Sequence, residues 1–161
     1  MKTKPDIPVA AMPTLRLLYT SIVELGDPLV IGNTPAGFRR VIPILGGRFS
    51  GPRIHGQILQ GGADWQIARY DGSLQVKARY TLKTEDGYMI DVINRGIRHG
   101  PLEVIERLIA GEEVSPDQYY FRTTPVFEAG EPSLAWLNTI VAVASGERHP
   151  DHVVMTVYEV L

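Results

Sequence analysis

The sequence predicts an all-β protein, built as a sandwich or a barrel, and two observations support this. Short segments rich in β-branched and aromatic residues recur along the chain, and each is bounded by glycine or proline. They follow one another at the short, regular spacing that is typical of sandwiches and barrels. Because 161 residues are enough to bury a core without metal or disulfide staples, we expect residues 1–161 to form one domain.

About ten strand-like segments are expected. The clearest of them span residues 15–25, 38–44, 53–60, 65–72, 73–83, 88–95, 117–129, 138–146 and 152–160. The strongest hairpin signal is Asp86-Gly87, because this pair accepts the left-handed backbone of a tight turn. It joins two of the segments and indicates antiparallel pairing.

One segment is predicted to be a helix that covers one end or face of the sheet. Pro101 can occupy its first position and Gly111 can end it. Leu102, Ile105, Leu108 and Ile109 recur at helical spacing between charged residues. A second, shorter helical turn is expected over residues 134–137.

Glycines recur every five positions at Gly46, Gly51, Gly56 and Gly61. They lack the spacing of a dinucleotide-binding fingerprint or of a P-loop, so a phosphate cradle is not favoured. Strand side chains alternate with period two, which places these glycines on alternating faces. They are therefore predicted to be bulge or bend points, which the strands of a small barrel need.

Composition excludes several classes of function. A formal charge of −2 provides no overall basic field for a nucleic-acid partner. The absence of cysteine excludes disulfides, thiolate catalysis and cysteine-ligated metals. No apolar run approaches the length of a membrane span, and Pro5, Pro8 and Pro13 interrupt the N-terminal apolar patch. We expect a cytoplasmic protein that needs neither a membrane nor a cofactor.

Asp64-Trp65-Gln66, just after Gly61-Gly62, is the first candidate site. A carboxylate beside an indole loses water, which raises its pKa and suits it to acid–base chemistry. Asp64 and Gln66 share one face of the strand and Trp65 points to the other. In the alternative interpretation Asp64 caps a turn and Trp65 packs in the core.

The segment YYFRTTPVFE contains the second candidate. Tyr120, Arg122 and Thr124 share a face, and Glu128 follows beyond Pro125. The Arg122 guanidinium could hold a substrate carboxylate in a two-point geometry, with Glu128 as a second acid–base group. Alternatively, Arg122 and Glu128 form a structural ion pair, since buried charges are normally paired.

Other polar residues are assigned by their position along the strands. Trp136, Asn138 and Arg148 are expected at the barrel mouth, although Trp136 could also pack in the core. Arg79, Arg95 and Arg98 are expected in solvent. His149 and His152 lie on a proline turn, which makes a poor metal site, so no metal is predicted.

The chain also resembles a known family. The strings GGRFSGP, GQILQGGADWQ, ARYTLKTEDGYMI, NRGIR, YYFRTTPVFE, WLNTIVAVASGER and VYEV are similar, in this order, to the domain-of-unknown-function 3237 family, also called uncharacterised protein family UPF0311. The resemblance covers residues 15–161. It implies an antiparallel β-barrel of lipocalin-like appearance, and it assigns no activity and no catalytic residue.

Three functional hypotheses follow. In the first, a small-molecule pocket at the barrel mouth belongs to a metal-free acid–base enzyme, an isomerase, hydratase or lyase that acts on a small cyclic or aromatic acid. Asp64 or Glu128 transfers the proton, Arg122 anchors the anion, and Trp65, Tyr120 and Trp136 form the walls. In the second, the same pocket serves a carrier or sensor without turnover. In the third, the chain is a structural subunit of a homo-oligomer.

Overall fold

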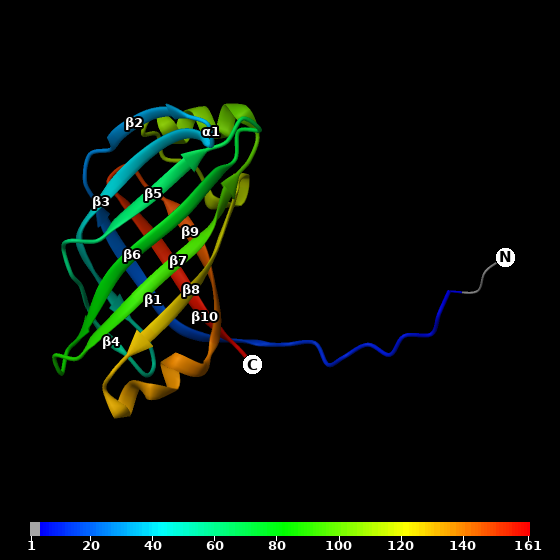
Figure 1. Cartoon of the computed structure of the whole chain (residues 1–161), viewed down its shortest axis with the longest axis vertical. Helices are drawn as coiled ribbons and strands as arrows, with labels where there is room; N and C mark the ends of the chain where they lie inside the picture. The colour runs from blue at the N-terminus through cyan, green and yellow to red at the C-terminus, as the bar shows by residue number, and fades with distance from the viewer. Residues whose placement is uncertain (1–3) are drawn as a thin grey trace.

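The computed structural model describes residues 4–161 and shows an antiparallel β-barrel (Figure 1). Its strands are β1 Leu15–Leu25, β2 Leu29–Thr34, β3 Gly37–Ser50, β4 His55–Ile58, β5 Ala63–Ala68, β6 Leu74–Thr84, β7 Met89–His99, β8 Tyr120–Ala129, β9 Val141–Arg148 and β10 His152–Val160. Helix α1, Leu102–Ile109, lies at one end of the barrel, and the 3₁₀ segment η2, Pro132–Thr139, lies at the other. A short 3₁₀ turn, η1, spans Pro116–Gln118. The prediction of a β-barrel is confirmed.

The ten strands fill eight positions around the barrel. Strand β2 continues β1 along the same edge of β3, after a break at Gly26-Asp27-Pro28. On the other edge of β3, β4 and β5 pair with it in succession, and both also pair with β6. The pairing of β1 with both β10 and β3 closes the sheet, so the barrel positions are continuous. Strand β2 was missed in the sequence analysis, which expected no strand between residues 25 and 38.

Glycine bends β3 where the sequence was expected to end it. The predicted strand stopped at residue 44, but β3 runs on through Gly46-Gly47 to Ser50. A Cβ on Gly47 would lie 2.0 Å from the Ile22 carbonyl oxygen of the neighbouring strand. Glycine therefore allows the two backbones to approach closely here, whereas the sequence predicted a bulge or bend point at these positions.

The predicted helix is present, but its buried face differs from the expected one. Pro101 is the N-cap, and Gly111, with φ +78°, follows the C-terminus. Val104 and Leu108 are buried, whereas Leu102 and Ile109 are exposed. An eight-residue helix presents little more than one i, i+4 pair to the barrel, so one rotation of the helix decides which residues are buried. The predicted turn at 134–137 is confirmed as part of η2.

The barrel interior divides into two halves. The half nearer η2 is filled by apolar side chains, with the Tyr19 ring packed edge-on against Phe49 and Phe127 at centroid distances of 5.4 and 6.1 Å. The half nearer α1 contains a cavity. Among the described helices, none has the length and hydropathy that crossing a membrane requires.

Candidate functional site

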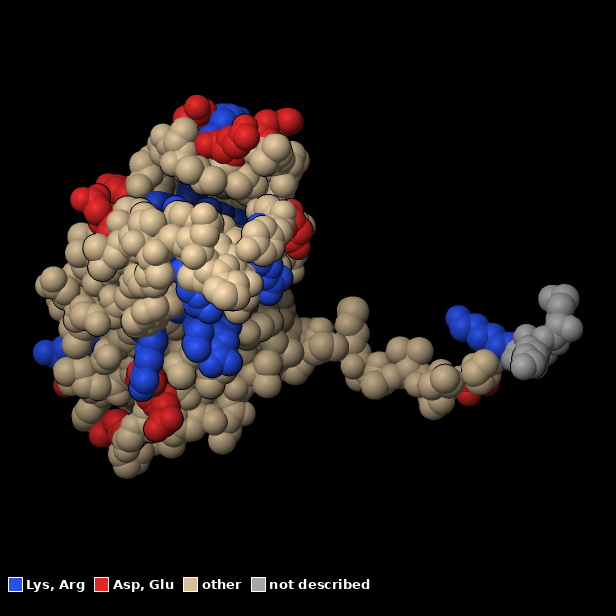
Figure 2. Space-filling view, turned by 45° about the horizontal axis from the view of Figure 1, so that its top comes forward, with Lys and Arg blue, Asp and Glu red and all other residues tan. Residues whose placement is uncertain are grey.

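The cavity in the α1 half is lined by apolar side chains and by a smaller set of polar ones. The space between its lining atoms is about 700 Å³ with the open mouth included, and the centre of a water molecule can move through about 80 Å³ of it. Figure 2 shows basic side chains recessed beneath the lobe at the top of the view. The polar lining residues are Arg40, Asp64, Gln66, Tyr80, Asn94, Arg98, Thr123 and Arg148. Apolar walls with a few polar groups are typical of small-molecule sites.

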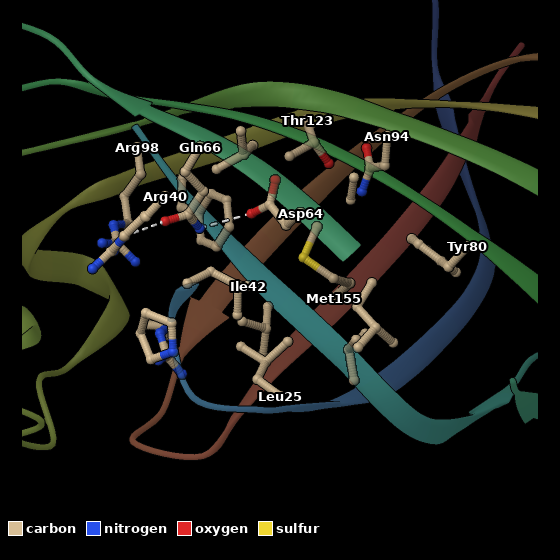
Figure 3. Close-up of a pocket in the computed structure, with 18 residues that line it drawn as sticks. Leu25, Arg40, Ile42, Asp64, Gln66, Tyr80, Asn94, Arg98, Thr123 and Met155 are labelled. Carbon is tan, nitrogen blue, oxygen red and sulfur yellow. Dashed lines mark hydrogen bonds between the residues drawn. The ribbon is translucent and has the colours of Figure 1, made fainter. Parts of the chain in front are cut away.

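The Asp64 side chain lies at a gap in the hydrogen-bond ladder between β5 and β6. Its Oδ1 accepts the backbone N–H of Lys77 at 2.8 Å, and its Oδ2 accepts the Gln66 amide at 2.7 Å (Figure 3). Burial raises the pKa of this carboxyl, although both hydrogen bonds and the charges of Arg98 and Arg40 oppose the rise. Asp64 therefore lies in a dry setting that favours its protonated form more than water does.

Three arginines line the part of the cavity nearer α1. Arg40 donates from Nε to Gln66 Oε1 at 2.7 Å, so Gln66 links it to Asp64. Arg98 is 4% exposed, and burial together with the charges of Arg148 and Arg40 lowers its pKa to about 10. Burial and the charge of Arg40 also lower the pKa of Arg148. The three guanidinium groups are thus close enough to repel one another.

This cluster carries more positive than negative charge. Within residues 4–161, none of the three arginines forms an ion pair within 4.0 Å. The Arg148 guanidinium donates to the backbone carbonyls of His149 and His152. Of the lining residues that the structure describes, Asp64 alone carries a carboxylate. A buried cation without a partner is costly, so the cluster is suited to an anion from outside the chain.

Glycines on β7 and β9 make room for the cavity wall. A Cβ on Gly146 would lie 2.4 Å from the Phe121 ring, so this ring rests directly on the β9 backbone. A Cβ on Gly96 would lie 2.6 Å from the Thr123 Cγ2. The Arg98 guanidinium lies 5.9 Å from the centre of the Phe121 ring. Because neither glycine has a side chain, Phe121 and Thr123 can pack against the backbones of β9 and β7 and line the site.

Polar groups also line the deeper part of the cavity. Asn94 and Thr123 are 6% and 3% exposed. Neither the Asn94 Oδ1 nor the Thr123 Oγ1 has a hydrogen-bond partner in the described chain, and the same is true of the Arg98 Nε. Burial raises the pKa of the nearby Tyr80 to about 12, which keeps its hydroxyl protonated. These groups could all receive polar atoms of a ligand.

Three of the sequence-predicted residues line this cavity. Asp64 and Gln66 point inward from β5, and Arg148 lies at the end of β9. Trp65, between the two polar residues of β5, is 45% exposed on the outer surface. The alternation along β5 is therefore as predicted, with the polar face turned toward the interior.

The residues predicted on β8 lie outside the barrel. Tyr120, Arg122 and Glu128 are exposed, while the alternate positions of the strand are buried. Arg122 lies 5.3 Å from the centre of the Tyr120 ring and donates to the Phe121 carbonyl. The shared face was predicted, but it is the outer one, because Phe121, Thr123 and Phe127 occupy the inner face.

Trp136 and Asn138 belong to η2, at the end of the barrel opposite the cavity. The Arg53 guanidinium lies 3.9 Å above the Trp136 ring. The Asn138 side chain bonds both backbone groups of Ala129, at 2.8 and 2.9 Å, and so fixes η2 to the end of β8. Both residues close the packed end rather than line the site.

The histidine turn forms local contacts. The His149 and His152 rings stack at 4.5 Å, His149 contacts Glu113, and His152 contacts Asp151. Within residues 4–161, no group of three or more histidine, aspartate or glutamate residues is placed to hold a metal ion.

Arg98 was expected in solvent and is buried in the cavity. The signal that could have placed it is the alternation of β7, where Ile90 and Val92 point inward and put Asn94 and Arg98 on the same face. Arg40 could have been found in the same way from Ile42 and Ile44 of β3. In both strands, a polar residue that continues an apolar face is expected to point inward with it. Arg79, in contrast, is exposed as expected and pairs with Asp91.

Comparisons with known proteins agree with the fold. A family model described as "Protein of unknown function (DUF3237)" matches residues 13–160. A UPF0311 protein of Rhodopseudomonas palustris is 44% identical over 151 residues, which cover 92% of this chain and 99% of that protein. A UPF0311 protein of Clostridium acetobutylicum is 38% identical, covering 89% of this chain and 91% of its own length.

Solved structures are similar over the same range. A conserved protein of unknown function from Rhodopseudomonas palustris has a TM-score of 0.89 at 40% identity, covering 95% of this chain and all of its own. A "beta-barrel like protein" from Acinetobacter baumannii has a TM-score of 0.83 at 38% identity, covering 95% and 99%. A crystal structure described as an enzyme from Penicillium herquei shares the fold, with a TM-score of 0.71 at 17% identity and full coverage of both chains.

Proposed function

Because this chain belongs to the DUF3237 family, also called UPF0311, whose name assigns no reaction, we propose a function from the site itself. The barrel binds a small organic anion in its α1 half, and Asp64 transfers a proton to or from that ligand. The reaction class is isomerisation, hydration or a lyase step on a small acid. The observation that carries the proposal is the presence of three guanidinium groups and one carboxylate in a single cavity.

The arginines supply the anchor for the anion. Arg98 has an unpartnered Nε and faces two other cations, so a carboxylate placed among the three removes their mutual repulsion. Guanidinium groups bind carboxylates with two parallel hydrogen bonds, which also fixes the orientation of the ligand. The apolar side chains around them, such as Ile42 and Met155, suit the hydrocarbon part of an organic acid.

Asp64 favours an enzyme over a carrier. Binding an anion requires only the arginines, and a carboxylate in the same cavity weakens the attraction unless it is protonated. The pKa of Asp64 is raised, so its proton is available closer to neutral pH than that of an exposed aspartate. Gln66 and the Lys77 N–H hold its two oxygens in place. The proposal also accords with the description of the Penicillium herquei neighbour as an enzyme, although their similarity extends only to the fold.

Calorimetric titration with benzoate and with its neutral amide, benzamide, tests the anchor. Wild type should bind benzoate and not benzamide, and Arg98→Met should weaken benzoate binding by about 30-fold or more, the usual effect of removing one partner of a buried charge pair. Arg122→Met is the matched control, since Arg122 is an exposed arginine on the outer face, and it should bind benzoate like wild type. Equal binding of the acid and the amide would contradict the proposal.

Deuterium uptake by a bound ligand tests proton transfer directly, so the overall reaction need not be known. Keto acids and unsaturated acids that bind are incubated in deuterated buffer with wild type and with Asp64→Asn, and carbon-bound deuterium is followed by NMR. Uptake that needs Asp64, with binding retained in the variant, supports the enzyme. Binding of these acids without any uptake would favour the carrier or sensor instead.

A further inference from the structure

The polar groups of the cavity lie at two levels along β7. Arg98 and Asn94 are four residues apart and both point inward, which separates their Cα atoms by about 13 Å in an extended strand. Thr123 lies between them, because it pairs with Gly96. Arg98 is the member nearest α1, which begins three residues after β7 ends. The cavity thus has a cationic outer level and a hydrogen-bonding inner level, with the Asp64 carboxyl between the two (Figure 3).

Two polar atoms of the inner level lack hydrogen-bond partners. The Asn94 Oδ1 and the Thr123 Oγ1 are buried, line the cavity and bond to nothing in the described chain. A buried polar atom without a partner costs stability, so such atoms are uncommon in folded proteins and call for an explanation. Here both atoms face the same cavity, which the outer arginines already make suitable for an anion.

A hydroxyl group is the ligand group that fits this inner level. It donates and accepts, so it complements the Asn94 amide in either orientation and the Thr123 hydroxyl in either role. An aldehyde or ketone oxygen only accepts, and a second carboxylate would have to be desolvated away from the arginines. The phenol of Tyr80, whose pKa burial raises, adds no charge to this level.

Resting on the proposed function, we infer that the ligand of this site is a hydroxy acid with its two groups at opposite ends: a carboxylate among the three arginines, and a hydroxyl between Asn94 and Thr123. The apolar wall formed by Val76, Phe121 and Met155 contacts the hydrocarbon between the two groups. The spacing of the two levels excludes acids whose hydroxyl is adjacent to the carboxylate.

The test compares pairs of acids that differ only in the distal hydroxyl. Calorimetry measures 4-hydroxybenzoate against benzoate, 4-hydroxyphenylacetate against phenylacetate, and 4-hydroxycinnamate against cinnamate. For at least one pair, wild type should bind the hydroxylated acid about tenfold more tightly, as one or two buried hydrogen bonds allow. Thr123→Val and Asn94→Leu should each remove most of that preference and leave the affinity for the acid without hydroxyl within about twofold.

Thr124→Val is the matched control, because Thr124 is the neighbouring threonine on the outer face of β8. It should keep the full preference. Thermal melting monitors folding, and Thr123→Val should melt no lower than wild type, since it replaces an unpartnered buried hydroxyl with a methyl group.

The outcomes separate the two proposals. If no acid binds wild type, the proposed function fails. If acids bind but no pair shows a preference for the hydroxyl, the anion site stands and this inference is overturned. A preference that survives both Thr123→Val and Asn94→Leu would also overturn it, because the hydroxyl would then be recognised elsewhere.

Discussion

The two halves of the barrel interior are built from the same strands, but these strands turn different side chains inward in each half. Toward η2, Leu82, Ile90 and Phe127 fill the space, and each is at most 5% exposed. Toward α1, the same β6, β7 and β8 turn Val76, Asn94 and Thr123 toward a cavity. The change takes place within two or three inward positions on each strand.

The residues that stabilise the fold and the residues that line the cavity thus lie mainly at opposite ends of the barrel axis. The η2 half buries apolar surface, which is the main favourable contribution to folding. The α1 half buries the Arg98 cation and, within residues 4–161, three of the five buried side-chain polar atoms that lack a partner, and all of these oppose folding. Such costs at one end of a fold are expected at functional sites, where the surrounding structure is stable enough to tolerate them.

The largest expected effect is the difference in stability lost when an aromatic ring is truncated in each half. Phe127→Ala leaves a cavity in packed surroundings and should lower the free energy of unfolding by about 3–5 kcal/mol. Phe121→Ala should cost roughly half as much, because the Phe121 ring already borders open space. Urea unfolding of both variants measures the difference. Equal losses would show that the α1 half is packed as tightly as the other.

Removing the buried Arg98 cation should raise the free energy of unfolding rather than lower it. In the absence of ligand, Arg98→Met should raise the free energy of unfolding by about 1 kcal/mol, because it replaces an unpaired charge with an apolar side chain of similar length. The benefit should vanish in saturating benzoate, which stabilises only the protein that binds it. A large loss of stability in Arg98→Met without ligand would mean that Arg98 has a structural role instead.

A third expected effect is a change of stability with pH. The folded-state pKa of Asp64 is raised above its unfolded value, so its contribution is favourable below the unfolded pKa, near 4, and is lost as pH rises through the folded pKa. Asp64→Asn should therefore gain stability relative to wild type as pH rises between the two pKa values, by about 1.4 kcal/mol for each pH unit that separates them. Urea unfolding at several pH values measures the gap between the two proteins. A gap that stays constant with pH would contradict a raised pKa.

Local signals in the sequence were enough for most of the elements. Strands β1 and β10 begin and end where the sequence placed them, and the Asp86-Gly87 turn joins β6 to β7 as predicted. Strand β3 was cut short because glycine usually ends a strand, whereas here Gly47 lets it pass close to β1. That contact is made between distant parts of the chain and leaves no local signal.

The site was only partly predictable for a related reason. Alternation showed that Asp64 and Gln66 share a face, and that Tyr120 and Arg122 share another, but it did not say which face points inward. On β8 the apolar Phe121 and Phe127 could have decided this, and on β7 Ile90 and Val92 could have done so for Arg98. The clustering of Arg40, Arg98 and Arg148 comes from barrel closure, which brings β3, β7 and β9 around one cavity.

The central claim is that the α1 half of the barrel holds an organic anion on its arginines. A crystal structure with 4-bromobenzoate tests this most directly, since the anomalous signal of bromine marks the far end of the ligand. The account predicts the carboxylate at Arg40, Arg98 and Arg148, with bromine deeper in the cavity toward Asn94. Bromobenzoate bound only on the outer face beside Arg122 and Tyr120, or with bromine at the arginines and the carboxylate beside Asn94, would contradict it.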